Sequence, residues 1–574
     1  MPAARRASLP SADVKSANSR SADVVFAGGL AYSAGWGSPR AWGIAVCDGA
    51  IVAVAPDAEL RERVGAGTHV VDLGGRLLMP GFIDAHAHPV QGGLELLQCN
   101  LTDARGADDC VGIVADYAAA HPERGWITGG GWSMAHFPGG TPSADVLDAV
   151  ISDRPVFLMN RDHHGAWVNS AAMRLAGIGR DTPDPADGRI ERDAAGNPAG
   201  TLHEGATLMV QRLVPLVTVD DAVAGVVRGQ QEMFRFGITG WADAWVGKTG
   251  GMESIFDAYM AALDRDVLRA RVTGALWWER AAGLEQVESF VRLREAAAAR
   301  GRDDVFRADA VKIMVDGVAE NFSAAMSLPY LDGHGHATGN SGHTFLSPDA
   351  LAAAAIAVDA ADFQLHFHTL GDRAVAVGLD AIEAVKRANG PAAAARATLA
   401  HLQVVQEHDV ARFAPLGAIA NLQMLWAAVD EQLDELTFPF LDSALVARHY
   451  PFADLARAGA LLACGSDWPV STPNPWEAIA VGLTRAVEGR EVAGKQPDPR
   501  IGLHQRLDLV TMLDAYTAGS AYSNGRGDST GRLEVGYAAD LAVLEDDPFS
   551  LAPERVGHVG VGQTWVGGEL VAGE

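Results

Sequence analysis

Two histidines separated by one residue end an apolar stretch, LLMPGFIDAHAHP, at residues 77–89. On an extended backbone, side chains two residues apart project from the same face, so His86 and His88 can point into one space. Imidazole nitrogens placed in this way suit a divalent metal ion. An isolated pair of this kind is equally typical of a surface loop. The metal interpretation therefore depends on further ligands downstream.

Four later apolar runs carry polar residues of the types that a metal site needs. Lys312 lies in KIMVDG, His366 and His368 lie in LHFHTLGD, His401 lies in LAHLQ, and Asp467 ends LLACGSD. Each has a common structural explanation on its own, such as a core histidine, a snorkelling lysine or a helix cap. Their recurrence at the ends of strand-like runs favours one shared site for zinc or a similar divalent ion.

The same residue types predict a hydrolytic chemistry. A lysine amine is a poor bridging ligand, but a carbamate formed on Lys312 with CO₂ would be an anionic ligand that joins two metals. A hydroxide between the metals would be the nucleophile, because metal binding lowers the pKa of water toward neutrality. Asp467 would be the catalytic residue that accepts its proton and returns it to the leaving group.

The elements that must position these residues alternate along the middle of the chain. Strand-like runs such as PVFLMN at 155–160 and FQLHFH at 363–368 alternate with alanine-rich amphipathic segments at 284–301, 347–361 and 372–390. Strand–helix alternation predicts parallel pairing, and its length fits an α/β fold, a (β/α)8 TIM-like barrel with insertions. A doubly wound sheet is the alternative, but no GxGxxG motif opens a helix after the first strand. We therefore predict the barrel.

Both ends of the chain have the pattern of short strands separated by glycine turns. An Asp48-Gly49 pair between two apolar runs predicts a hairpin. We predict that residues 23–78 and 529–574 form one small β-sandwich beside the barrel, which with its insertions spans residues 79–528. Two separate β-modules would show the same pattern. Residues 1–22 are small and polar, which predicts a disordered tail.

Composition limits the partners of this protein. Its 574 residues are 48% hydrophobic and 20% charged, as in ordinary globular proteins. The net charge of −27 argues against nucleic acid and anionic membranes, and no apolar run is long enough to span a bilayer. Scattered cysteines and the lack of a signal segment predict a reduced, cytoplasmic protein. We expect a small-molecule substrate and a homo-oligomer, a dimer.

In combination, these motifs resemble the amidohydrolase superfamily, and within it the YtcJ-like metal-dependent hydrolases, a branch that also contains N-substituted formamide deformylases. The resemblance extends from about Val24 to about Val571 and rests on PGFIDAHAH, KIMVDG, HTLGD and GSDWPV. The chain departs from the branch at two places. Ala400 replaces an acid before His401, and Met424 follows Gln423 where a proline is usual.

The resemblance implies a binuclear metal centre, most simply of two zinc ions, that hydrolyses the C–N bond of a small amide such as an N-acyl or N-formyl amine. His366 matches no ligand position of the branch. The implied ligands are His86, His88 and Asp467 for one ion, His368 and His401 for the other, and carbamylated Lys312 between them.

Several further residues are candidates for contact with the substrate. His164, in NRDHHGAWVNS, matches a histidine that lines the active site in the branch, although a structural role in the insertion is an alternative. Tryptophans near strand ends would form an apolar pocket for an aryl or alkyl group, or would simply fill the core. These are Trp241, Trp245, Trp277, Trp278 and Trp426; weaker candidates are His203, Glu204, Asp372 and Arg373.

Other functions are compatible with the same residues. A cyclic amide, a carbamate or an ester would suit the same site, and a non-catalytic scaffold protein is a further alternative. A scaffold predicts the loss of ligands, whereas all six expected positions are filled. A fold resemblance does not name a substrate.

Overall fold

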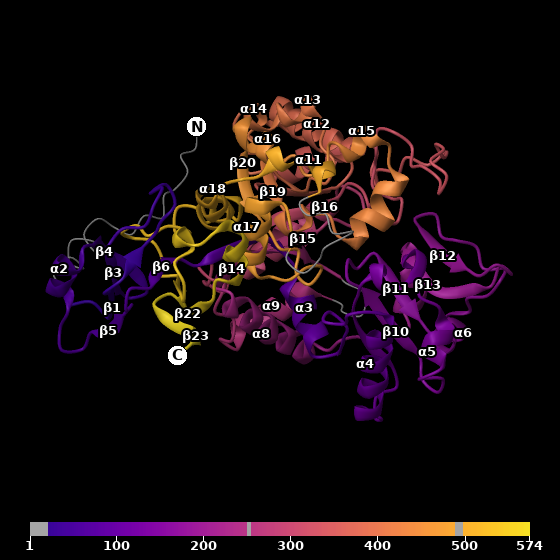
Figure 1. Cartoon of the computed structure of the whole chain (residues 1–574), viewed down its shortest axis with the longest axis horizontal. Coiled ribbons are helices and arrows are strands. Elements are labelled where there is room, and N and C mark those ends of the chain that lie inside the picture. The colour runs from indigo at the N-terminus through magenta and orange to yellow at the C-terminus, as the bar shows by residue number, and fades with distance from the viewer. Residues whose placement is uncertain (1–20, 249–253, 488–497) are drawn as a thin grey trace.

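The computed structural model describes residues 21–248, 254–487 and 498–574 of the chain (Figure 1). The predicted tail at residues 1–22 lies almost entirely outside the described residues. Within those residues, no helix combines the length and the apolar character that crossing a membrane requires.

The centre of the chain forms an eight-stranded parallel sheet that curls into a nearly closed barrel. Its edge strands meet through hydrogen bonds that Asp467 N donates to His86 O and His88 N donates to Trp468 O, both of 2.7 Å. The predicted (β/α)8 barrel is therefore confirmed. Its strands are β7 (Phe82–Ala87), β14 (Ile238–Val246), β15 (Arg271–Trp277), β16 (Phe306–Met314), β17 (Gln364–Thr369), β18 (Thr398–His401), β19 (Ile419–Leu422) and β20 (Leu461–Cys464).

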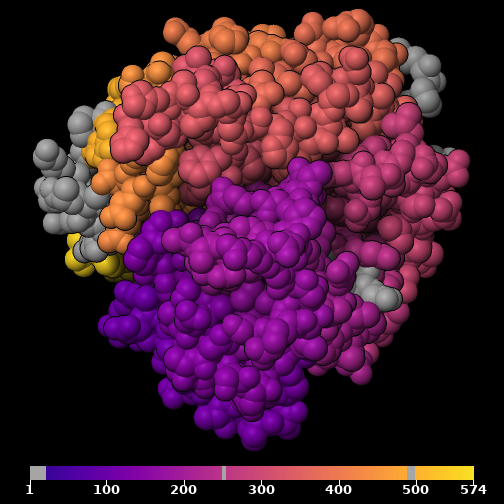
Figure 2. Space-filling model, turned by 90° about the vertical axis from the view of Figure 1, so that its right-hand side faces the viewer, coloured from indigo at the N-terminus to yellow at the C-terminus, as the bar shows by residue number. Residues whose placement is uncertain are grey.

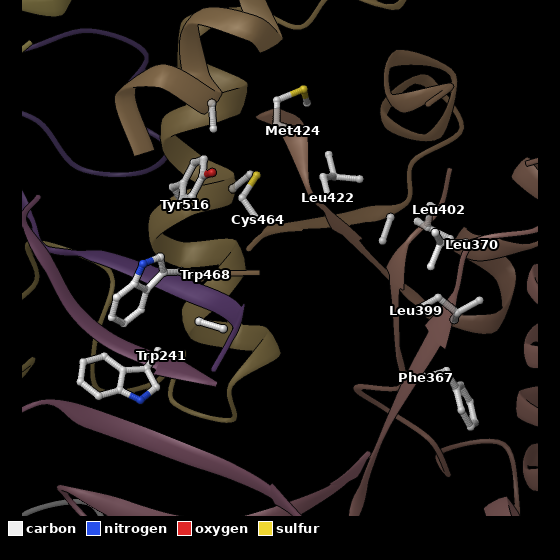
Figure 3. Close-up of a cluster of buried hydrophobic side chains, with 14 of the residues drawn as sticks. Trp241, Phe367, Leu370, Leu399, Leu402, Leu422, Met424, Cys464, Trp468 and Tyr516 are labelled. Carbon is white, nitrogen blue, oxygen red and sulfur yellow. The ribbon is translucent and has the colours of Figure 1, made fainter. Parts of the chain in front are cut away.

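Amphipathic helices cover the outer surface of the barrel, and the three alanine-rich segments form α10, α11 and α12 as predicted. Side chains along β17 alternate, so Phe367 packs in the core beneath the helices whereas His366 and His368 lie on the other face. Figure 3 shows Phe367 in this core with Leu399 and Leu422 of the next strands. The main helices are α3 (Pro89–Leu96), α8 (Val219–Arg235), α9 (Ile255–Asp264), α10 (Gln286–Ala298), α11 (Pro348–Ala360), α12 (Asp372–Asn389) and α17 (Pro475–Thr484).

A second sheet is inserted in the chain between barrel strands β7 and β14, and it faces the viewer in Figure 2. The run PVFLMN, which the alternation pattern grouped with the barrel strands, instead forms β10 of this insertion. The assignment of this run to the barrel was therefore wrong. A short apolar run indicates that a strand is buried, but it does not indicate which sheet the strand joins. In spatial order the strands are β12 (Gly188–Arg192), β13 (Pro198–Glu204), β11 (Gly165–Val168), β10 (Val156–Asn160), β9 (Ile127–Trp132) and β8 (Cys99–Asn100).

The strands at 24–80 and 541–573 lie together at the side of the molecule opposite the insertion (Figure 1). β6 (Leu77–Pro80) pairs with β21 (Leu541–Leu544), so strands from both ends share one sheet. Phe26 of the other sheet packs edge-on against Trp565, with ring centroids 5.0 Å apart. The sheet orders are β4-β3-β1-β5 and β2-β6-β21-β22-β23, with β1 (Val24–Ala27), β2 (Leu30–Ala31), β3 (Gly43–Cys47), β4 (Ala50–Ala55), β5 (His69–Asp72), β22 (Val561–Val566) and β23 (Glu569–Gly573).

The predicted hairpin at Asp48-Gly49 joins β3 to β4, with Cys47 opposite Ala50. Both turn residues have positive φ angles, of 50° and 76°. This backbone explains the Asp-Gly pair, because a two-residue hairpin turn of this type needs residues that tolerate left-handed conformations.

Candidate metal centre

The six predicted metal ligands converge at the carboxyl ends of the barrel strands. His86, Lys312, His368 and His401 lie within β7, β16, β17 and β18, whereas His88 directly follows β7 and Asp467 lies three residues after the end of β20. Active sites of barrel enzymes lie at this face, because the loops that follow the strands meet there. The fold therefore gathers residues that are far apart in the sequence.

Asp467 occupies the middle of the cluster. Its Oδ1 lies 2.9 Å from His88 Nε2 and 3.3 Å from His86 Nε2, and its Oδ2 lies 3.8 Å from His401 Nδ1. Lys312 Nζ lies 3.2 Å from His86 Nε2. His86, His401 and Asp467 each present a ligand atom within 4.8 Å of the others. One compact group of nitrogen and oxygen donors results.

His368 is oriented by Asp316, a residue to which the sequence analysis assigned no role. Asp316 Oδ1 lies 3.3 Å from His368 Nδ1, and the same carboxylate accepts backbone N–H groups of Ala325, Leu370 and Gly371. A carboxylate on one ring nitrogen directs the other nitrogen of a ligating histidine toward the metal. The sequence does contain a signal for this role, because Asp316 is the acid of KIMVDG, just beyond the strand that carries Lys312.

His366 stays outside the ligand group but contacts it. Its Nε2 lies 2.8 Å from His86 Nδ1, while the opposite nitrogen of His86 faces Lys312 and Asp467. His366 reaches this place because β17 pairs with β16 in a register that sets it beside Lys312. The structure therefore gives His366 an orienting contact to His86.

Burial keeps the imidazoles of the cluster in their neutral form. Desolvation lowers the pKa of His86, His366, His368 and His401 well below the usual value. A neutral imidazole has a lone pair for a metal ion, whereas a protonated imidazole does not. The histidines are therefore in the state that metal binding needs.

The lysine and the aspartate of the cluster are also shifted. Burial lowers the pKa of Lys312 to about 7, so the unprotonated amine is available near neutral pH. Burial by itself would raise the pKa of Asp467, but the hydrogen bond with His88 and the nearby His401 lower that pKa to about 2. Asp467 is therefore an ionised carboxylate beside a nucleophilic amine.

Unsatisfied nitrogen atoms support a metal at this place. In the described part of the chain, both ring nitrogens of His401 and Nδ1 of His88 are buried without a hydrogen-bond partner. Leaving such a group unpaired costs about 1–3 kcal/mol, which coordination to a metal would avoid. His401 and Asp467 also have left-handed φ angles of 80° and 57°, and such strain is typical of functional sites. The donor set fits zinc or a similar divalent ion.

A cavity of about 950 Å³ lies between the barrel and the insertion, next to the cluster. Trp245 lines it, with its ring centroid 6.4 Å from that of His88. Trp277, also on the wall, stacks against Trp245 with centroids 4.3 Å apart and planes 13° apart. Trp241, within β14, and Trp278, directly after β15, are instead buried in the core.

The insertion brings two consecutive histidines to this region, each beside a largely buried acid. His163 Nε2 lies 3.0 Å from Glu95 Oε1, and His164 Nδ1 lies 2.9 Å from Glu204 Oε2. The His164 ring centroid is 5.9 Å from that of His368, so His164 borders the metal ligands. His163 and Glu204 have left-handed φ angles of 63° and 50°.

His164 and Glu204 form an ionic pair at neutral pH. Burial opposes a charge on His164, but the carboxylate of Glu204 outweighs it and raises the His164 pKa to about 9. Burial would likewise raise the pKa of Glu204, but His164 lowers it to about 2. Glu204 also accepts a hydrogen bond from Ser323 Oγ at 2.7 Å. The carboxylate of Glu204 therefore holds the positively charged imidazole of His164 beside His368.

The remaining candidates have partners away from the cavity. Trp426 stacks on His401 with centroids 5.3 Å apart and planes 2° apart, outside the cavity lining. His203 contacts Glu191, and Arg373 donates to the carbonyl groups of Ser341 and Gly342. Asp372 accepts hydrogen bonds from Ser327 and Gln406. A substrate contact of Trp426 stays a prediction.

The sequence model of the Amidohydrolase family matches residues 69–572. Because this match covers most of the chain, the protein belongs to the amidohydrolase family, whose members are metal-dependent hydrolases. The predicted resemblance is thereby confirmed.

Two relatives and one solved structure match nearly the whole chain. YtcJ of Bacillus subtilis (strain 168) is 28% identical over 561 residues, which cover 96% of this chain and 99% of that protein. The N-substituted formamide deformylase of Arthrobacter pascens is 27% identical and covers 92% of this chain and 94% of its own length. A crystal structure of an uncharacterized metal-dependent hydrolase from Pyrococcus furiosus has the same fold, with a TM-score of 0.68, 23% identity and coverage of 92% of this chain and 99% of that chain.

Proposed function

We propose that this protein hydrolyses the C–N bond of a small amide, an N-acyl or N-formyl amine. The observation that carries the proposal is the convergence of six ligand-type side chains beside a cavity of about 950 Å³, which suits a small molecule. Similarity to an N-substituted formamide deformylase supports the choice of a C–N bond. The filled ligand positions argue against a non-catalytic scaffold.

The ligand set divides between two divalent ions in this proposal, with zinc the expected metal. When bound, these ions would supply a nucleophile near neutral pH and polarise the scissile carbonyl group. Lys312 is the proposed bridge, as a carbamate, because its amine is buried with a pKa of about 7 and lies 3.2 Å from His86. The other ligands are His86, His88 and Asp467 for one ion and His368 and His401 for the second.

We assign the proton transfer to Asp467. It is ionised, and its two oxygens face different histidines, so one oxygen can coordinate while the other accepts a proton. An amine leaves poorly unless its nitrogen is protonated, so the same carboxylate would deliver that proton to the leaving group. His164, fixed by Glu204 beside His368, is positioned to hold a polar group of the substrate.

A panel of matched compounds tests the proposal. Zinc-loaded full-length protein is incubated with N-formyl, N-acetyl and cyclic amides and with esters that share the same aryl or alkyl portions, and the release of amine or alcohol is measured. We expect amine release from N-acyl or N-formyl compounds and about two metal ions per chain. Hydrolysis of the esters alone would contradict the C–N assignment. No hydrolysis by metal-loaded protein would favour the scaffold alternative.

A further inference from the structure

The cavity wall that starts at the metal centre is made of stacked aromatic rings. Trp277 ends β15 in a register that places it opposite Lys312 on β16, so the wall begins at a ligand-bearing strand. Trp245 stacks on Trp277 and adjoins His88. Flat apolar groups bind well to such surfaces, because large aromatic areas are removed from water.

A guanidinium group lies along the same cavity. Arg280, three residues after Trp277, lines the cavity, and its guanidinium carbon lies 3.3 Å from the centroid of the Phe345 ring. Phe345 donates its backbone N–H to Val315 O, just beyond the end of β16. Stacking on Phe345 therefore anchors the planar group at the mouth of the barrel.

Arg280 has no ion-pair partner within the described residues, where no carboxylate oxygen comes within 4.0 Å of its guanidinium. Glu204, Asp187 and Glu279 act on it only from longer range, and burial lowers its pKa because desolvation outweighs these three acids. Glu204 is already bonded to His164 and Ser323. Arg280 is therefore a partly buried cation that no described carboxylate contacts directly.

The rest of the cavity does not repeat this arrangement. Its acids Glu95 and Glu204 are each paired with a histidine, whereas Asp187 and Glu279 line it without a described ion pair. Its other arginine and lysine side chains, Arg212 and Lys248, are both exposed. An anion would consequently gain most at Arg280, because a charge-assisted, bidentate contact is strongest where the guanidinium is partly removed from water.

We propose that the cavity binds the non-reacting part of the substrate as a flat apolar group that carries an anion, with the ring against Trp245 and Trp277 and the carboxylate or sulfonate on Arg280. This inference rests on the proposed function, because it names the class of amide that the centre would cleave. Amides whose aryl portion carries a free carboxylate or sulfonate should accordingly be preferred over neutral amides of the same shape.

Two small probes separate charge from shape without any hydrolysis. Phenylmethanesulfonate and benzyl methyl sulfone share the ring and the sulfonyl group, but only the first is charged, and a sulfonate is a weak metal ligand. Titration calorimetry on zinc-loaded full-length protein should show about tenfold tighter binding of the sulfonate. Arg280→Gln should remove that preference, and Arg212→Gln should keep it, since Arg212 is exposed and is not assigned to the anion.

Equal binding of the two probes to the unmodified protein would overturn the inference, as would a preference that survives in Arg280→Gln. Should Arg280→Gln fail to fold, Arg280→Lys replaces it. That variant keeps the charge but loses the planar fork, so the preference should fall to a few-fold. A full preference for the sulfonate in Arg280→Lys would overturn the planar, two-bonded contact with Arg280.

Kinetics distinguish a failure of this inference from a failure of the proposed function. The matched substrates are 4-formamidobenzoate and N-formyl-4-toluidine, and we expect the carboxylated amide to have the lower KM with a similar kcat. Amine release from neither compound, with the sulfonate preference intact, would defeat the C–N proposal and leave the anion site standing. Equal kcat/KM values with no sulfonate preference would defeat the anion site and leave the hydrolase standing.

Discussion

The metal centre and the cavity beside it are built from different parts of the chain. Every candidate ligand comes from the carboxyl end of a barrel strand, where the sheet holds it among neighbouring strands. The opposite cavity wall comes from the insertion and includes His163 and Glu204. Each of these residues is held by an ion pair and has a positive φ angle. The barrel therefore supplies the candidate ligands together with the aromatic wall and Arg280, whereas the insertion closes the cavity from the other side.

The two regions also position their residues by different physical means. Strand register sets Lys312 beside His366 and Thr369 beside His401, so ligand spacing follows from sheet hydrogen bonds. His164 instead depends on one acid, Glu204, which lies 40 residues away. A substitution on the barrel side should therefore affect metal binding or turnover, whereas one on the insertion side should leave metal content intact.

The largest expected effect comes from Lys312→Ala, which removes the proposed bridging ligand. Metal content and activity should be lost together, and short carboxylic acids with bicarbonate should partly restore both. Metal analysis and amine release measure this, with Lys386→Ala, a lysine distant from the centre, as the control. An unmodified amine at Lys312 in metal-loaded, active protein would contradict the bridge.

Asp467→Asn should separate chemistry from metal binding within the barrel. The amide oxygen can still coordinate, but it cannot accept a proton, so turnover should fall by about 10²–10⁴-fold while metal content stays within about twofold. Metal-loaded variant and unmodified protein are compared in the same amine-release assay, with the exposed Asp546→Asn as the control. Turnover within a few-fold of the unmodified protein would assign the proton transfer to another residue, and His164 would be tested next.

His366→Ala tests the contact with His86. A residue that orients a ligating histidine typically changes metal affinity by about 10–100-fold when it is removed. His366→Gln should retain part of the affinity, because its amide can still form a hydrogen bond with His86. Competition with a metal chelator measures the affinity, and the exposed His336→Ala is the matched control. Unchanged affinity in both His366 variants would mean that His86 is oriented by its other contacts.

Glu204→Gln should have the smallest effect on the metal centre, because it acts on the insertion side. The ion pair with His164 is lost, so the free energy of unfolding should fall by about 1.5–3 kcal/mol while metal content is unchanged. Denaturant unfolding and metal analysis check both quantities. Metal loss comparable to that in His366→Ala would contradict the division between barrel and insertion.

The stability difference between Glu204→Gln and the unmodified protein should also depend on pH. The His164 pKa is raised from 6.5 to about 9, so its contribution is complete below about pH 6.5 and is lost as the pH rises through about 9. The Glu204 pKa is lowered to about 2, so that contribution is lost only as the pH falls through about 2. Unfolding measured at about pH 6 and about pH 10 should therefore show the larger difference at the lower pH.

The barrel, its helices and the ligand types were predictable because each depends on local pattern. Alternating strand-like and amphipathic segments imply parallel pairing, and parallel strands bring their carboxyl ends to one face. Histidines, a lysine and an aspartate at those ends then imply a metal site. The Asp48-Gly49 hairpin was predictable for the same reason, since the turn chemistry is contained in two residues.

Which distant residues contact one another follows only from the tertiary structure. His366 and His86 are 280 positions apart, Asp316 and His368 are 52 apart, and Arg280 meets Phe345 from a different strand end. The run PVFLMN belongs to the insertion sheet because it pairs with β9 and β11. Its apolar pattern by itself is compatible with either sheet. Local sequence pattern identifies the chemical groups that lie at the strand ends. Only the packing of distant segments determined which nitrogen faces the centre, which acid holds it, and which cation faces the cavity.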